Sequence, residues 1–297
     1  MEGKLNLLSD LSNDFGRLLS SGDNYDVIIK AGEGQNMKKF FAHSLILGER
    51  SMHFKSTLSK ERTKKDDEVI IFKIPNISPD TFELLLKYLY TGMVDLDDQN
   101  GVQVLKLYRA ADELNLRELN DYIRPYLISN QAKYLRHEPV EILQIVLQYE
   151  TFEDLRNYCL ENICKSPKVL FESPKFTLLG NELIIPLLMC DLEMEEIVIW
   201  NYILKWGMSK MSTRLDVDNI SRWTLDYFKE LERILHELIP LIRWFQISAK
   251  DFWRKVSPFE QIFPKQLYKD IIGHYLDPET PPISVILSLR SNNFRLD

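Results

Sequence analysis

The sequence predicts an α+β domain, with a small sheet and surrounding helices, followed by an all-helical domain. Runs rich in β-branched and aromatic residues, "YDVIIK", "KFFAH" and "VIIFKI", all lie before residue 75. From Gln131 onward apolar residues recur at helical spacing and strand signals almost vanish. The 297 residues suit two domains of about 100 to 150 residues each. We expect an N-terminal helix over 1–22, an α+β domain over 23–129, a helical domain over 131–240, and a helical extension and tail over 241–297.

The first expected element is an amphipathic helix that ends at "SSGDN". Its apolar residues fall at i, i+3, i+7 and i+10, which places them on one side of a helix. They are Leu8, Leu11, Phe15 and Leu18. Such an apolar stripe needs a partner surface.

A hairpin and two short helices follow. "YDVIIK" at 25–30 and "KFFAH" at 39–43 flank a glycine-containing loop, which is typical of a β-hairpin. We expect helices from about Ser44 and from about Ser51, separated by Gly48. The charged run "SKERTKKDDE" at 59–68 has no apolar periodicity and predicts a solvated loop, and "VIIFKI" predicts a buried strand.

Helices complete the first domain. In "SPDTFELLLKYLYTG", Ser78 suits the N-cap, Pro79 the first helical position and Gly92 the C-terminal end. A core stripe at helical spacing is formed by Phe82, Leu85, Leu86 and Leu89. The next helix carries Val104, Leu107, Tyr108 and Ala111. A further helix is expected from about Arg117 to Ser129.

The second domain is expected to be helical throughout. "EMEEIVIWNYILKWGMSK" predicts a helix with Ile199, Ile203 and Trp206 facing inward. A later helix is stopped by Pro240, because proline removes a backbone donor and clashes with the preceding turn. The final residues predict smaller helices and then a proline-rich, frayed tail.

Composition excludes several classes of function. A net charge of −7 argues against nucleic-acid binding, which depends on clustered Lys and Arg. No run approaches the ~18 apolar residues of a membrane span, and the N-terminus lacks the apolar core of a secretory signal. The cysteines, Cys159, Cys164 and Cys190, lack metal-ligand spacing and predict free thiols in a reducing compartment, the cytoplasm or the nucleus.

Asp26, His43 and Ser44 contain the residue types of a catalytic triad. A hydrolase would require these side chains to converge in an open cleft, and no Gly-x-Ser-x-Gly elbow surrounds Ser44. The favoured interpretation is structural: His43 packs between sheet and helix with its ring nitrogens satisfied, and Ser44 caps the following helix. We therefore expect no enzymatic activity, no cofactor and no metal.

Beyond these patterns, the sequence resembles a known family. The positions concerned are Asp26 with Val27, Ala42 with His43, Leu47, Ser51, Phe54, Phe82, Tyr88 with the "YTG" turn, and "AADELNL" at 110–116. In this order they resemble the BTB (POZ) domain from about Asp23 to Ser129. Residues 131–240 resemble the BACK domain, with "IWNYILKWG" and "IPLIRWFQIS" as the strongest matches, as in fungal proteins that often carry a TLDc or Kelch region.

The resemblance implies a homodimer that recruits a Cullin-3-type scaffold and acts as a ubiquitin-ligase adaptor for a protein substrate that the sequence does not identify. It implies a dimer interface at Leu8, Leu11, Phe15, Leu18 and Asp26, and a cullin-facing set of Phe54, Leu58 and Tyr90. The 59–68 loop lacks the hydrophobic-x-Glu element common in cullin-binding members, which leaves a dimeric scaffold without cullin binding as the alternative. Ser44 stands where repressor members carry a basic residue, and the chain ends without a Kelch or complete TLDc region.

Overall fold

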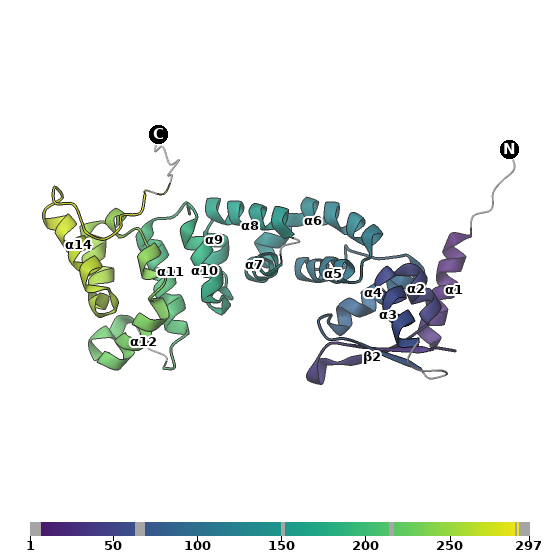
Figure 1. The fold of residues 1–297 in the computed structure, drawn as a ribbon. Helices are drawn as coiled ribbons and strands as arrows, with labels where there is room; N and C mark the ends of the chain where they lie inside the picture. Colours follow the sequence, from purple (N-terminus) through teal and green to yellow (C-terminus); the bar gives the residue numbers. More distant parts are fainter. Residues whose placement is uncertain (1–6, 63–68, 150–151, 214–216, 289, 291–297) are drawn as a thin grey trace, which may run out of the picture. The chain divides into compact units, whose positions relative to one another are not determined.

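We describe the chain from a computed structural model (Figure 1). It describes residues 7–62, 69–149, 152–213, 217–288 and 290. The chain divides into two compact units, 1–138 and 139–297, which are treated separately below. In the described part of the chain, no helix combines the length and apolar character needed to cross a membrane.

The first unit contains a three-stranded mixed sheet. Its strands are β1 (Val27–Ala31), β2 (Lys38–Ala42) and β3 (Ile70–Ile74), in the order β2-β1-β3. β1 pairs antiparallel with β2 and parallel with β3, so the predicted hairpin is confirmed. The expectation that β3 is a buried strand is wrong in part, because β3 lies at an edge and Ile71 is 55% exposed. An edge strand covered on one face buries only alternate side chains.

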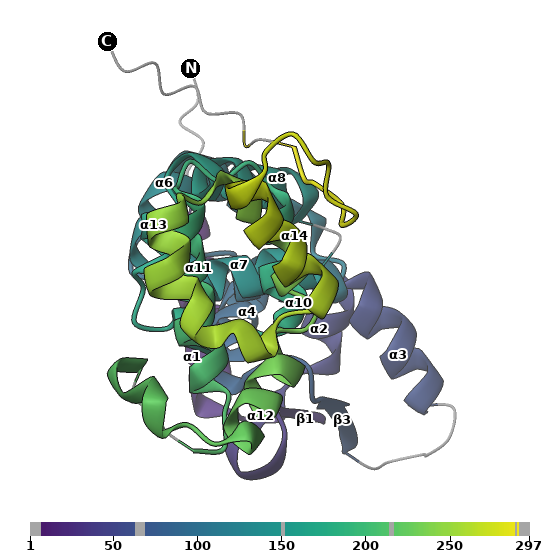
Figure 2. The ribbon, with the colours of Figure 1, turned by 90° about the vertical axis from the view of Figure 1, so that its left-hand side faces the viewer.

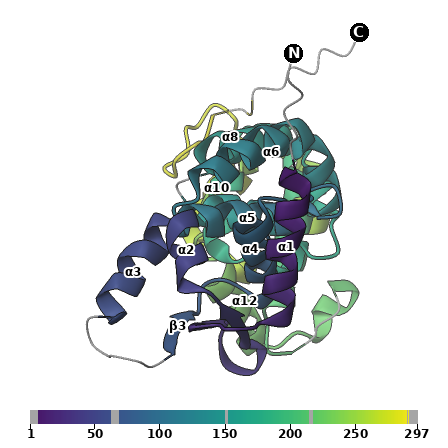
Figure 3. The ribbon, with the colours of Figure 1, turned by 90° about the vertical axis from the view of Figure 1, so that its right-hand side faces the viewer.

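Helices lie on one side of this sheet (Figures 1 and 3). They are α1 (Leu8–Ser21), α2 (Ser44–Arg50), α3 (Met52–Arg62), α4 (Pro79–Thr91), α5 (Gly101–Glu113) and α6 (Arg117–His137). The break between α2 and α3 falls at Ser51, while Gly48 lies inside α2. Ser51 makes this break because its hydroxyl accepts from the Phe54 amide and donates to the Leu114 carbonyl.

The signals that predicted α4 are confirmed. The Ser78 hydroxyl accepts from the Thr81 amide, and Gly92 ends the helix with a φ of 70°, a left-handed conformation that suits glycine. The predicted stripe of Phe82, Leu85, Leu86 and Leu89 is buried.

The last helix of this unit is longer than predicted. α6 continues from Ser129 to His137, so the expected domain boundary near residue 130 lies inside a helix. Its additional turns bury Tyr134 and Leu135. A Cβ on Gly101, at the start of α5, would lie 2.6 Å from Cγ of Tyr134, so only glycine permits this approach. The packing of Tyr134 on α5 keeps this part of α6 in the first unit.

The second unit is mostly helical, as predicted. Its helices are α7 (Pro139–Gln148), α8 (Glu153–Lys165), α9 (Lys168–Phe171), α10 (Asn181–Met189), α11 (Glu196–Ser209), α12 (Leu225–Leu235), α13 (Ala249–Asp251) and α14 (Lys265–Leu276). Figure 2 views α11, α12 and α14 from the side of this unit. The predicted inward residues Ile199, Ile203 and Trp206 are buried. Trp200 and Trp244 pack edge to face at 5.1 Å between ring centroids.

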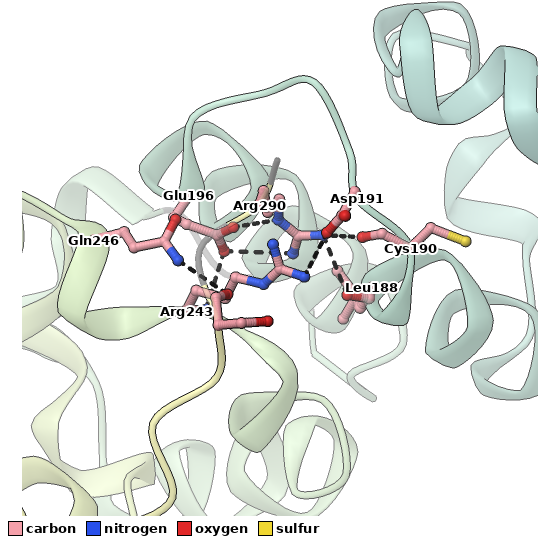
Figure 4. A network of polar contacts seen from close by, with 8 residues as sticks. Leu188, Cys190, Asp191, Glu196, Arg243, Gln246 and Arg290 are labelled. Carbon is pink, nitrogen blue, oxygen red and sulfur yellow. Dashed lines mark hydrogen bonds and ion pairs between the residues drawn. The ribbon is translucent and has the colours of Figure 1, made fainter. Parts of the chain in front are cut away.

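A buried ionic network joins the end of the chain to the start of α11 (Figure 4). Arg290 is 4% exposed, and its guanidinium pairs with the Glu196 carboxylate and donates to the carbonyls of Leu188 and Cys190. Glu196 also accepts from the Arg243 amide at 3.0 Å. The prediction of a frayed tail is therefore wrong at Arg290, because its contacts are with residues about one hundred positions earlier.

We expect Glu196→Ala to lower the free energy of unfolding of the second unit by about 3 to 5 kcal/mol. The substitution leaves the buried Arg290 guanidinium without its carboxylate partner. All five tryptophans lie in the second unit, so urea titration followed by tryptophan fluorescence measures it. Glu161→Ala, which removes an exposed ion pair with Lys165, is the control and should leave the midpoint unchanged. Equal midpoints for both variants would contradict the expectation.

Candidate functional site

The polar joint between the hairpin and α2 brings together Asp26, His43, Ser44 and Tyr90. One Asp26 oxygen accepts from the Ser44 amide at 2.7 Å and the other from the Ser44 hydroxyl at 2.5 Å. The cap of α2 is therefore the Asp26 carboxylate. The prediction that the Ser44 side chain is the cap is wrong, because its hydroxyl donates to Asp26.

His43 has partners for both ring nitrogens, as predicted. Its Nδ1 lies 2.6 Å from the Tyr90 hydroxyl and its Nε2 lies 2.7 Å from the Asp23 carbonyl. The same hydroxyl accepts from the His43 amide, so it directs its own proton to Nδ1, and Nε2 then donates to the carbonyl. Burial raises the pKa of Tyr90 to about 12, which keeps this donor protonated at neutral pH.

These contacts differ from those of a catalytic triad. A triad requires the histidine ring to bond the nucleophilic hydroxyl on one side and the carboxylate on the other. Here the Ser44 hydroxyl bonds Asp26 directly, and the His43 ring bonds Tyr90 and the Asp23 carbonyl. A groove of about 400 Å³ contains Asp26 and Ser44 in its lining, and His43 is not among the residues that line it. The three residues fasten α2 to the sheet.

α1 presents the predicted apolar stripe at the surface. It is held on α4 by a hydrogen bond of 2.7 Å from the Ser12 hydroxyl to the Thr91 carbonyl. Leu8 is 67% and Leu11 is 52% exposed, and Phe15 and Leu18 are half-buried. The structure therefore brings four of the five predicted dimer-interface residues together on one helix. It places the fifth, Asp26, at the α2 cap.

A wide groove is lined in part by α1, on a side that does not include the stripe residues. It encloses about 1190 Å³ and is lined by one side of α1, by β2 and by α4. Phe41 lies in its lining and is 45% exposed, with its ring packed on Tyr25 at 4.7 Å between centroids. Met93, which is 50% exposed, adds further apolar surface. Phe41 and Met93 thus add exposed apolar surface to a groove that α1 lines mostly with small and polar residues.

The predicted cullin-facing side chains lie in the interior. Phe54, Leu58 and Tyr90 are 0%, 4% and 5% exposed, so a surface position for them is wrong. The ring of Phe54 packs on Phe72 of β3 at 5.7 Å between centroids. A sequence pattern shows that a helix has an apolar face but does not say which neighbour covers it. Phe54 and Leu58 hold α3 in place, and the opposite face of α3 remains exposed.

The exposed face of α3 lies at the margin of the first unit (Figures 2 and 3). It is formed by Met52, Lys55, Ser56 and Ser59, and Met52 is 65% exposed. α3 extends to Arg62, so the first part of the predicted 59–68 loop is helical. Residues 63–68 of that loop lie outside the described residues.

Leu45, on α2, is an exposed residue that the sequence analysis did not select. It is 75% exposed and lines the groove between α2 and α3 together with Lys55. Leu45 follows the cap and belongs to an apolar run, "LIL", in which Leu47 is fully buried. Leu45 and Leu47 are two residues apart, so a helix places them on opposite sides. With Leu47 in the core, this spacing indicates that Leu45 is exposed.

The described residues offer no metal site: they contain no group of three or more His, Cys, Asp or Glu side chains arranged to hold an ion. The chemistry available at these surfaces is that of contact with other proteins. Exposed apolar side chains within a polar rim are typical of such surfaces.

Comparison with known proteins supports a role in binding other proteins. Residues 15–131 match the BTB/POZ domain family, so the first unit contains a BTB/POZ domain. The chain is 33% identical over 120 residues to Trishanku of Dictyostelium discoideum, which covers 39% of this chain and 16% of that protein. It is 26% identical over 195 residues to rat Kelch-like protein 25, which covers 64% of this chain and 30% of that protein.

Two further comparisons are with BTB domains or proteins that contain one. A putative BTB/POZ domain-containing protein of Arabidopsis thaliana is 26% identical over 132 residues, covering 44% of this chain and 80% of that protein. The solved structure of the BTB domain of zebrafish PATZ1 aligns over 43% of this chain and 99% of that domain, with 20% identity and a TM-score of 0.35. The chain spans less than a third of Trishanku and of Kelch-like protein 25. The family model matches residues 15–131, so the resemblance of 131–240 to the BACK domain of fungal proteins with a TLDc or Kelch region stays a prediction.

We expect Asp26→Ala to destabilise the first unit by about 1 to 2 kcal/mol, because the Ser44 amide and hydroxyl lose their acceptor. Calorimetry should record the lower stability, and amide exchange should accelerate in α2. Asp23→Ala is the matched control, since the Asp23 side chain is exposed and His43 uses only its backbone carbonyl. If α2 exchanges at the same rate in both variants, Asp26 is not the cap.

Proposed function

We propose that this protein is a homodimeric substrate adaptor of a Cullin-3-type ubiquitin ligase. The observation that carries the proposal is a BTB/POZ domain with two exposed helical faces, the apolar stripe of α1 and the outer face of α3. One face serves a second copy of the chain and the other serves the cullin. The chain holds a protein substrate, and the bond-making chemistry belongs to the other components of the ligase.

Dimerisation follows from the apolar surface of α1. A two-fold interface is self-complementary, so the same stripe on both copies supplies both sides of the contact. Leu8 and Leu11 are each more than half exposed, and burying a leucine is worth about 1.5 to 3 kcal/mol. Phe41 and Met93 line the neighbouring groove and are also exposed. Their apolar area would enlarge the buried interface, and a stable interface needs a large buried area.

Light scattering should give the intact chain about twice its mass of 35.0 kDa. The double variant Leu8→Asp, Leu11→Asp should give the monomer mass, because a charge at each position opposes burial of the stripe. Leu178→Asp is the matched control, since Leu178 is 64% exposed in the second unit, and it should leave the mass unchanged. A monomeric parent chain at micromolar concentration would overturn the dimer proposal.

Cullin binding is assigned to the outer face of α3 and the adjoining α2–α3 groove. Phe54 and Leu58 fix the inner face of α3, so its outer face is presented on a rigid support. Met52 and Leu45 supply exposed apolar contacts there, and Lys55 supplies a positive charge. Apolar anchors within a polar surround carry most of the affinity in many interfaces.

Calorimetric titration with the N-terminal domain of a Cullin-3-type protein should show a Kd in the micromolar range or tighter. The double variant Met52→Glu, Lys55→Glu should weaken binding by at least about tenfold, equal to 1.4 kcal/mol. Met189→Glu is the control, because Met189 is 68% exposed in the second unit. Unchanged binding by the double variant would exclude this face.

The alternative function is a dimeric BTB scaffold that binds no cullin. The lack of a hydrophobic-x-Glu element in 59–68 favours it. A parent chain that forms dimers and shows no binding in the titration would establish this alternative over the adaptor. In either case we place the protein in the cytoplasm or the nucleus.

A further inference from the structure

A pocket in the first unit lies between the end of α4, the loop that follows it and α6; we call it the α4–α6 pocket. It encloses about 870 Å³, within the ~300–1,000 Å³ range of ligand pockets. Three tyrosines line it, namely Tyr88 from α4 and Tyr122 and Tyr126 from α6. Tyr122 is 57% exposed, so much of its side chain is open to a ligand. The walls of the pocket are therefore rich in aromatic surface.

The α4–α6 pocket also carries negative charge. Its lining includes the carboxylates of Asp95, Asp97 and Glu118 and one ammonium group, that of Lys87, which leaves a net charge of −2. Glu118 and Tyr122 are four residues apart on α6, so they lie side by side on one face of the helix. In the part of the chain that the structure describes, the Glu118 carboxylate makes no hydrogen bond or ion pair. It is therefore available to a ligand.

The two aspartates are held in position by neighbouring groups. The Tyr126 hydroxyl donates to the Asp97 carboxylate at 2.9 Å and lies 3.1 Å from the Leu96 carbonyl. The Asp97 amide donates to the Asp95 carboxylate at 3.0 Å. These bonds tie the loop after α4 to α6 and fix the acidic side of the pocket. Acceptors that are already in position bind a ligand at a lower cost in entropy.

A guanidinium group suits these walls better than other cations. The Arg50 guanidinium of this chain already lies 5.3 Å from the centroid of the Tyr88 ring, a cation–π distance. A guanidinium is planar, so it can stack on a tyrosine ring while its N–H groups donate to a carboxylate. The ammonium of lysine is a compact point charge without this planar fork. Tyrosine rings beside carboxylates therefore favour arginine.

We propose that the α4–α6 pocket binds an arginine side chain from a basic segment of a partner protein. The guanidinium stacks on Tyr122 and donates to the neighbouring Glu118 carboxylate, and the aspartates of the loop complement its charge. The pocket is separate from the apolar stripe of α1 and from the outer face of α3. This contact goes beyond the proposed adaptor function, because it requires neither dimerisation nor a cullin.

A fluorescently labelled peptide of alternating glycine and arginine is the probe, titrated with the full chain at low ionic strength and followed by anisotropy. Matched peptides carry lysine, or the uncharged arginine analogue citrulline. The arginine peptide should bind saturably with a Kd below about 1 mM, at least about tenfold tighter than the citrulline peptide and tighter than the lysine peptide. Absence of saturable binding, or equal binding of the arginine peptide and either matched peptide, would overturn the proposal.

Substitutions in the full chain locate the binding site. Glu118→Gln should weaken binding of the arginine peptide about tenfold, because it removes a charged acceptor. Tyr122→Ala should weaken it about two- to fivefold, and Tyr122→Phe, which keeps the ring, should retain it. Asp98→Asn is the matched control, since Asp98 is exposed in the same loop and outside the pocket lining. Circular dichroism checks the folding of each variant. If Asp98→Asn weakens binding as much as Glu118→Gln, the peptide responds to overall charge and the pocket is excluded.

Discussion

The first unit depends on the burial of one strand. β1 is the central strand of the sheet, and its residues Val27, Ile29 and Ala31 have no exposed surface. Because this strand is paired on both edges and covered on one face, it fixes the positions of the strands and helices that contact it. Asp26, directly before β1, fastens α2, and β3, which pairs with β1 on the side opposite β2, supports α3.

This constraint explains why the proposed contact surfaces are helical. The apolar face of α3 packs on β3. The polar face of α3, together with Met52, therefore remains exposed for a partner. α1 contacts α4 through small residues, Ser12 and Gly16 against Thr91, and Leu8 and Leu11 stay exposed. An exposed apolar stripe is costly in water, and a second copy that covers it, as in the proposed dimer, would relieve this cost.

In the second unit, the buried Glu196 carboxylate has a comparable role, because it holds several segments together. It receives the Arg290 guanidinium and the Arg243 amide, so the end of the chain, the start of α11 and the segment after α12 are joined at one point. Buried ion pairs are sensitive to the loss of either partner.

The sequence by itself determined the elements whose signals are local: the caps and stripe of α4, the β1–β2 hairpin, the apolar stripe of α1 and the helical second unit. It also identified the joint at Asp26, His43 and Ser44 as structural. Tertiary structure decided which partner each side chain meets. It buried Phe54, Leu58 and Tyr90, extended α6 through Tyr134, and paired Arg290 with Glu196. The physical reason is that periodicity records the face of an element, whereas these contacts join residues far apart in the chain.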